Sequence, residues 1–171
     1  MENAKIGLSS ENLLKIELNS FGDYIVISAD NTRFFDGFAA GYKRIVDLAD
    51  NVPVKMSEIE KKYDNCQDFS SVMDKAVEMS KVNVDFSREA IKIIDDIFGD
   101  GTVKKYFRKL YEEIPDFLPD SDCIIDFFEQ ITPVVETQFG RKIERQKEAS
   151  KARMSKYKPH DPHDHMTEGR Q

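Results

Sequence analysis

Residues 87–102 read SREAIKIIDDIFGDGT, and this stretch decides the fold expected for the chain. Ser87 is a residue type that caps helix starts, and Gly99 can end a helix in a left-handed conformation. Asp100-Gly101 is typical of a turn, and Thr102 of the start of a further helix. The apolar residues recur at the spacing of one buried helix face, at Ala90, Ile91, Ile94, Ile97 and Phe98. The stretch therefore predicts a helix, a tight corner and a restart.

Helical periodicity extends upstream of this stretch. Asp30-Asn31-Thr32 offers capping side chains, and a long apolar stripe follows, with Pro53 as the point of a kink or restart. A second helical pattern begins near Phe69 and includes Met73 and Met79, which we assign to the core in preference to an adaptable peptide-binding groove. If residues 68–98 are unbroken, they form one helix about 46 Å long.

Two glycines on the first helical segment leave two interpretations open. Gly37 and Gly41 lie four residues apart, so they fall on one face of a helix. Either they permit the close approach of another helix or of the N-terminal strands, or they are simply tolerated there.

Downstream of the corner, the pattern predicts two more helices. A short one runs from Val103 to Ile114 and ends at Pro115, and an apolar loop at 117–119 is expected to enter the core. Asp120-Ser121-Asp122 caps the last helix, in which we expect Pro133 to cause a kink rather than an end. The apolar face of that helix consists of Ile124, Phe127, Phe128, Ile131, Val135 and Phe139.

The N-terminal part has strand rather than helix character. Residues 13–20 alternate between apolar and polar, and residues 24–28 are aromatic and β-branched, with turn residues at 21–23. A lone hairpin is marginal in water and must pack against something. The fold class expected is mostly α with a small N-terminal β-hairpin (α+β): a helical bundle with a projecting charged C-terminal helix.

Charge divides the chain unevenly. Residues 1–140 hold 16 basic and 27 acidic residues, whereas residues 141–158 hold eight basic and two acidic ones. We expect a frayed N-terminus at 1–12, a single helical domain at 13–140, a basic helical extension at 141–158 and a disordered tail at 159–171.

Features of secreted and membrane proteins are not expected. The N-terminus lacks the apolar run of a signal peptide, and no stretch approaches the roughly 20 apolar residues of a membrane span. Cys66 and Cys123 lack a metal-ligand spacing and are read as thiols, which suits a reducing compartment. These observations predict a cytosolic protein.

The residues that could carry chemistry favour structural roles. His160, His163 and His165 could bind a metal ion with the aspartates between them, but a disordered tail has nothing to hold the ligands in place. The carboxylates Asp95, Asp96, Asp100, Glu112, Glu113 and Asp116 could suggest acid–base or Mg²⁺ chemistry, and we place them on polar faces and at caps. We expect no enzyme activity and no cofactor, and keep a metal-dependent hydrolase as a minor alternative.

The basic extension is the candidate binding element. Its cations are interleaved with glutamates and the body is acidic, so a protein partner suits it better than nucleic acid. The candidate contact residues are Arg141, Lys142, Arg145, Lys147, Lys151 and Arg153.

Four stretches together resemble one protein family. They are KIELNSFGDYIVIS (15–28), SADNTRFFDGF (28–38), IIDDIFGDGTVKKYF (93–107) and RKIERQKEASKARMSKYKP (141–159). The chain looks like the small tail assembly chaperones of long-tailed bacteriophages that infect Gram-positive hosts, and the match covers roughly residues 13–158. Its most distinctive piece is the corner, where residues 93–102 resemble an FFDxLFGxGT pattern.

This resemblance implies a non-catalytic role in the infected cell. Such chaperones coat the long tape measure protein and keep it soluble until tail tube subunits displace them. The expected partner is a tape measure protein, with the tail tube protein and a further copy of this chain as additional candidates, and with neither nucleic acid nor membrane. The expected location is the host cytoplasm and not the mature virion. The alternative is a cytosolic regulatory or adaptor protein that binds another protein through its acidic body.

Overall fold

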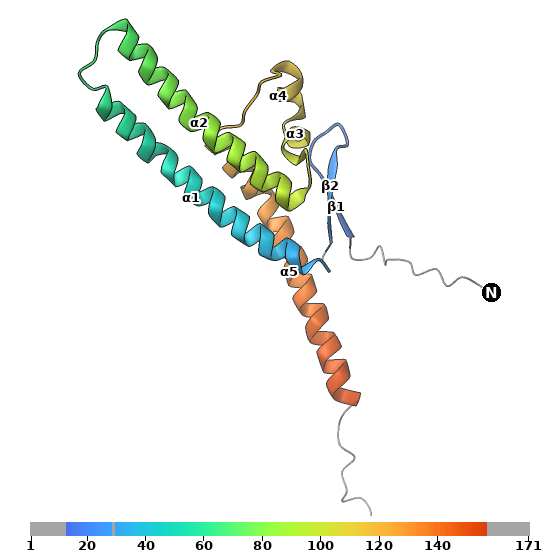
Figure 1. Ribbon diagram of the computed structural model, residues 1–171. Coiled ribbons are helices and arrows are strands. Elements are labelled where there is room, and N and C mark those ends of the chain that lie inside the picture. The colour runs from blue at the N-terminus through green and yellow to red at the C-terminus, as the bar shows by residue number, and fades with distance from the viewer. Residues whose placement is uncertain (1–12, 29, 157–171) are drawn as a thin grey trace, which may run out of the picture.

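A computed structural model describes residues 13–28 and 30–156 (Figure 1). Its elements are β1 (Leu13–Glu17), β2 (Tyr24–Ser28), α1 (Thr32–Lys62), α2 (Phe69–Phe98), α3 (Thr102–Tyr106), α4 (Arg108–Glu113) and α5 (Ser121–Lys156). The predicted fold class is confirmed: an antiparallel hairpin is followed by helices. The predictions for residues 1–12, for the end of the extension and for the tail at 159–171 fall outside the described residues.

The hairpin packs one face on the helices and is held by its turn. Ile25 and Ile27 of β2 are buried, and their partners across the pair are Ile16 and Leu14. The amide oxygen of Asn19 accepts hydrogen bonds from the backbone N–H of Phe21 at 2.9 Å and of Asp23 at 3.2 Å. The Asn19 amide group also donates to the Lys105 carbonyl at 2.6 Å, so one side chain shapes the turn and ties it to α3.

α1 and α2 form a long antiparallel helical hairpin (Figure 1). α1 continues through Pro53, so the sequence-based restart is not needed. The expected side-chain cap at the start of α1 is wrong, because Asn31 occupies the N-cap position without making a capping bond. α2 is unbroken and begins at the cap Asp68, whose carboxylate accepts from the Ser71 N–H at 2.9 Å.

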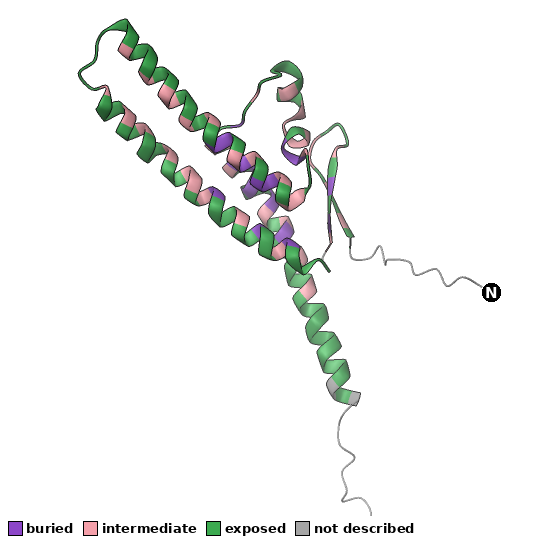
Figure 2. Ribbon diagram, viewed as in Figure 1, coloured by how far each residue is buried: buried purple, intermediate pink, exposed green. Residues whose placement is uncertain are grey.

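The core lies where α5 crosses the half of the helical hairpin nearest the β-strands. Figure 2 shows the buried residues gathered there, while the tip of the α1–α2 hairpin is mostly exposed. The ring of Phe98 is at the centre of an aromatic cluster, with centroids 5.7 Å from Phe34, 6.0 Å from Phe38 and 5.7 Å from Phe127. Ile94 is fully buried beside it, as the central stretch predicted.

Ser87 does not start a helix, which corrects its assignment as a cap. It lies within α2 and is buried, and its hydroxyl shares one proton between the carbonyl oxygens of Asn83 at 2.8 Å and Pro119 at 2.7 Å. The second contact joins α2 to the loop before α5. Pro119 is buried as expected for that loop, whereas Leu118 is exposed.

The corner is built differently from its prediction. Gly99 has φ 108° and ψ 152°, which is outside the left-handed helical region, and it is Gly101 that occupies that region, with φ 79° and ψ 10°. Gly101, and not Thr102, is the N-cap of α3. Gly101 has no side chain that could cap the helix, and the capping bonds come from α2 instead. The Asp95 carboxylate accepts from the N–H groups of Gly101 at 3.0 Å and Val103 at 3.4 Å.

The segment after the corner also differs from its prediction. The single helix expected from Val103 to Ile114 is two short helices, α3 and α4, which meet at Phe107. The last helix begins as predicted, because the carboxylate of Asp120 accepts from the Cys123 N–H at 2.9 Å. α5 then continues through Pro133 to Lys156.

Candidate protein-binding surfaces

The basic extension is the part of α5 that runs past the core. Arg141, Arg145, Lys147, Lys151 and Arg153 are exposed, and Lys142 is partly covered. The Lys142 ammonium lies 5.4 Å from the centroid of the Phe35 ring, which is a cation–π contact at the root of the extension. Figure 1 shows this part of α5 projecting away from the other helices.

The six predicted contact residues do not form one stripe. At 100° per residue, Arg141 and Arg145 share one side of the helix, while Lys147 and Lys151 share another. Only Lys142 and Arg145 are brought together, at a hollow of about 160 Å³ that Asp30 also lines. The extension therefore attracts acidic groups from several directions rather than fixing one orientation.

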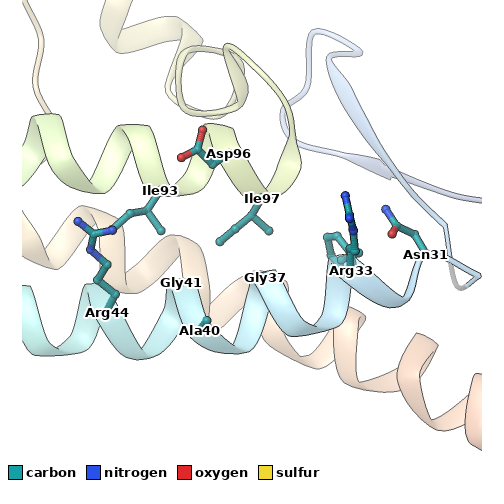
Figure 3. Close-up of a pocket in the computed structure, with 10 residues that line it drawn as sticks. Asn31, Arg33, Gly37, Ala40, Gly41, Arg44, Ile93, Asp96 and Ile97 are labelled. Atoms are coloured by element: carbon teal, nitrogen blue, oxygen red, sulfur yellow. The ribbon is translucent and has the colours of Figure 1, made fainter.

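A narrow groove separates the first turns of α1 from the end of α2 (Figure 3). It encloses about 350 Å³. Figure 3 shows Ile93 and Ile97 of α2 directed toward the glycines of α1, with Arg33 and Asp96 at the rim. A Cβ added at Gly41 would lie 2.5 Å from Ile97 Cδ1, whereas one at Gly37 would meet nothing within 4 Å. The close approach of α2 therefore requires a glycine at position 41. At position 37 a side chain would fit, so Gly37 is merely tolerated there.

A second groove, which we call the arm groove, runs along α1 and is closed at one end by the start of α5. It encloses about 790 Å³. Its lining residues are Tyr42, Val46, Ala49, Asp50, Val52, Pro53, Met56, Ser57 and Glu60 from α1, and Ser121, Asp122 and Ile125 from α5. The arm groove thus has an apolar floor and an acidic rim.

The arm groove follows from where α5 begins. In the core, α5 covers the side of α1 that carries Tyr42 and Phe38, with ring centroids 5.2 and 5.9 Å from Phe128. Since α5 starts only at Ser121, no described residue forms a third helix against α1 beyond about Pro53. Sequence reasoning missed this groove, because its residues repeat at the same helical spacing as the core.

The carboxylates singled out from the sequence take part in local structure. Asp95 caps α3, and Glu112 accepts from the Arg108 guanidinium at 2.9 Å. Among the described residues, no group of three or more His, Cys, Asp or Glu side chains is placed to hold a metal ion. The three histidines fall outside that part of the chain.

Both cysteines are free thiols, as the sequence predicted. Cys66 is exposed on the loop between α1 and α2. At Cys123, burial is the main cause that raises the thiol pKa, and the hydrogen bond with Asp120 raises it further. A raised pKa keeps a thiol protonated, so Cys123 is a weak nucleophile at neutral pH.

Within residues 13–28 and 30–156, no helix is long and apolar enough to cross a membrane. Family models, curated proteins and solved structures were compared with the chain, and none of them matches it.

Proposed function

We propose that this chain is a non-catalytic tail assembly chaperone of a long-tailed bacteriophage, which binds the tape measure protein and keeps it soluble during tail assembly. The arm groove carries the proposal. It offers an apolar floor at Val46, Ala49 and Met56 beside acidic groups at Asp50 and Glu60. An amphipathic helix with basic residues beside its apolar stripe is the partner that such a groove fits.

The separation of the two candidate surfaces supports a long partner. The arm groove ends at Ser121 at the start of α5, and the basic extension reaches Arg153 near its end. These residues are about 48 Å apart at 1.5 Å per residue. A short peptide can touch only one of the two surfaces, whereas a long helical protein can contact both.

The proposal places the chain in the cytoplasm of the infected cell. The client is held while tail tube subunits assemble around it and displace the chaperone, so the chaperone does not enter the virion. Such turnover requires contacts of moderate strength. Exposed ion pairs contribute only about 0–1 kcal/mol each, so the extension adds attraction that remains easy to release.

The test is a co-expression pull-down with a candidate tape measure protein. Met56→Glu puts a charge on the floor of the arm groove, and we expect it to reduce client recovery. The matched control is Val54→Glu, because Val54 is exposed and lies two residues away on another side of α1. Melting of both variants is measured first, so that loss of folding is not mistaken for loss of binding.

A deletion of residues 141–158 tests the second surface. We expect weaker recovery, and we expect added salt to reduce recovery by the full chain more than by the deletion. Equal effects of Met56→Glu and Val54→Glu would contradict the arm groove as the site. If no tape measure protein is recovered and the chain instead captures a basic regulatory protein through its acidic body, the adaptor function replaces the chaperone.

A further inference from the structure

We infer that two copies of this chain pair in antiparallel orientation through the outer face of α2, a surface distinct from the arm groove. The outer face consists of three apolar residues near the start of α2, spaced four apart so that they lie on one side of the helix. Their exposed fractions are 81% for Phe69, 48% for Met73 and 63% for Val77. Three neighbouring apolar side chains at this exposure form a patch of the kind that marks an interaction site.

The outer face points away from α1. Val82 follows Met73 by nine residues, which places it on the opposite side of the helix at 100° per residue, and Val82 is partly buried. Glu78 marks the α1 side as well, because its carboxylate accepts from the Lys62 ammonium at 2.5 Å and from the Tyr63 hydroxyl at 2.9 Å. α1 therefore cannot cover the outer face in this fold.

The open part of the face has a defined length. It ends near Ser87, where the loop that carries Pro119 lies on the helix and accepts the serine hydroxyl. From Phe69 to Val84 the face extends about 22 Å. No described residue covers Phe69, Met73 or Val77, so this part of the face is open to a second chain.

Charge complementarity identifies a second copy as the occupant. Asp74 and Lys81 are seven residues apart, which puts them on the same flank of the outer face, with Val77 near the midpoint between them. Both are exposed. When two such helices pair in antiparallel orientation about a two-fold axis beside Val77, Asp74 of each copy lies opposite Lys81 of the other.

The same register avoids conflicts elsewhere. It places Asp85 opposite Ser70, so like charges do not face one another, and it brings the two Val77 side chains together at the axis. Phe69 of one copy reaches the level of Phe86 of the other, one residue before Ser87 and near the loop in which Leu118 is 36% exposed. In a parallel pair, by contrast, Asp74 would remain about 10 Å along the axis from Lys81 of the second copy.

Sedimentation equilibrium of the full chain tests the inference. We expect a concentration-dependent species of twice the 19.7 kDa chain mass. Asp74→Lys and Lys81→Asp each convert both cross-pairs into like-charge pairs, so each variant alone should dimerise about tenfold more weakly or worse. Mixing the two variants restores both pairs between unlike chains, so the equimolar mixture should recover the dimer.

The mixing experiment separates pairing from folding, since a variant that is misfolded is not rescued by its partner variant. Val77→Asp is a further test at the axis and should give a monomer whose circular dichroism is unchanged. A wild-type chain that is monomeric at every concentration would overturn the inference. A dimer that both charge variants leave intact would also overturn it. So would chemical labelling in which the outer face of α2 becomes protected only when a helical client is added. None of these results bears on the arm groove.

Discussion

Alanine substitutions at the two glycines of α1 should have opposite effects on stability. Both glycines lie inside α1 at the α1–α2 groove. A Cβ at Gly37 meets nothing within 4 Å, while a Cβ at Gly41 meets Ile97 Cδ1 at 2.5 Å and Ile93 Cγ2 at 3.0 Å. Both substitutions change helix propensity by the same amount, and only the one at Gly41 changes packing. Comparing the two therefore measures the packing effect alone.

The magnitudes follow from two terms. Replacing glycine by alanine inside a helix raises the free energy of unfolding by about 0.8–1 kcal/mol, and this gain applies to both sites. Overpacking costs about 1–3 kcal/mol and applies only to Gly41. Ile97 can turn its terminal methyl away, but Ile93 Cγ2 is fixed close to its backbone and Ile93 is buried. Gly37→Ala should therefore be stabilising, and Gly41→Ala neutral to destabilising.

Urea denaturation followed by circular dichroism measures the difference. We expect the two variants to differ by about 1–3 kcal/mol in the free energy of unfolding, with unchanged slopes. Equal stabilisation by both substitutions would show that α1 and α2 are further apart at Gly41 than the structure places them. Equal destabilisation would show that Gly37 also has a close neighbour.

Three further predictions concern the central stretch and the ion pair between α1 and α2. Ile94→Ala should lower the free energy of unfolding by about 2–5 kcal/mol in the same assay, because the side chain is fully buried. Asp95→Ala removes the cap of α3 and should cost about 1 kcal/mol, whereas Asp96→Ala, its exposed neighbour, should cost little. The hydrogen bond from Lys62 is the main cause that lowers the pKa of Glu78 from its ordinary value, so its stabilisation is present at neutral pH and lost as the pH falls through the lowered pKa. Glu78→Gln should therefore show a shallower fall in melting temperature on acidification, measured by thermal scans at several pH values.

The sequence predicted the helices well because each has a long apolar period. The hairpin was expected from its alternation, and α5 with its buried residues except Phe139, which is 45% exposed. In α2, Ala90 and Ile94 were expected on the buried face, whereas the buried Phe86 and Ile93 were not. Ser87 shows the limit of this reasoning. Serine is common at helix starts, but here its hydroxyl is satisfied by the carbonyl of Pro119, which is 32 residues away in the chain. A local pattern cannot reveal a partner that only the fold supplies.

The corner shows the same limit at shorter range. Its residue types indicated a turn and a restart, and both occur. The cap was assigned to Thr102 because threonine is a common capping residue. The structure uses Asp95 instead, which reaches forward from the last turn of α2 to the N–H groups of Gly101 and Val103. Asp95 also fits the polar face of α2. The spacing of apolar residues therefore cannot show whether its side chain faces solvent or caps α3.

The faces of α2 explain why the binding surfaces were harder to predict than the fold. Met73 and Met79 were both assigned to the core, yet Met79 is partly buried and Met73 is 48% exposed. Six residues separate them, so they lie on different sides of the helix. A hydrophobic period states that a face is covered by something, and it does not say whether the cover belongs to the same chain. α2 has one apolar side that meets α1 and another, at Met73 and Val77, that no described residue meets. At its start, α2 has α1 on one side and an open apolar face on the other, which suits a second chain, and the flanking charges of Asp74 and Lys81 are placed to select it.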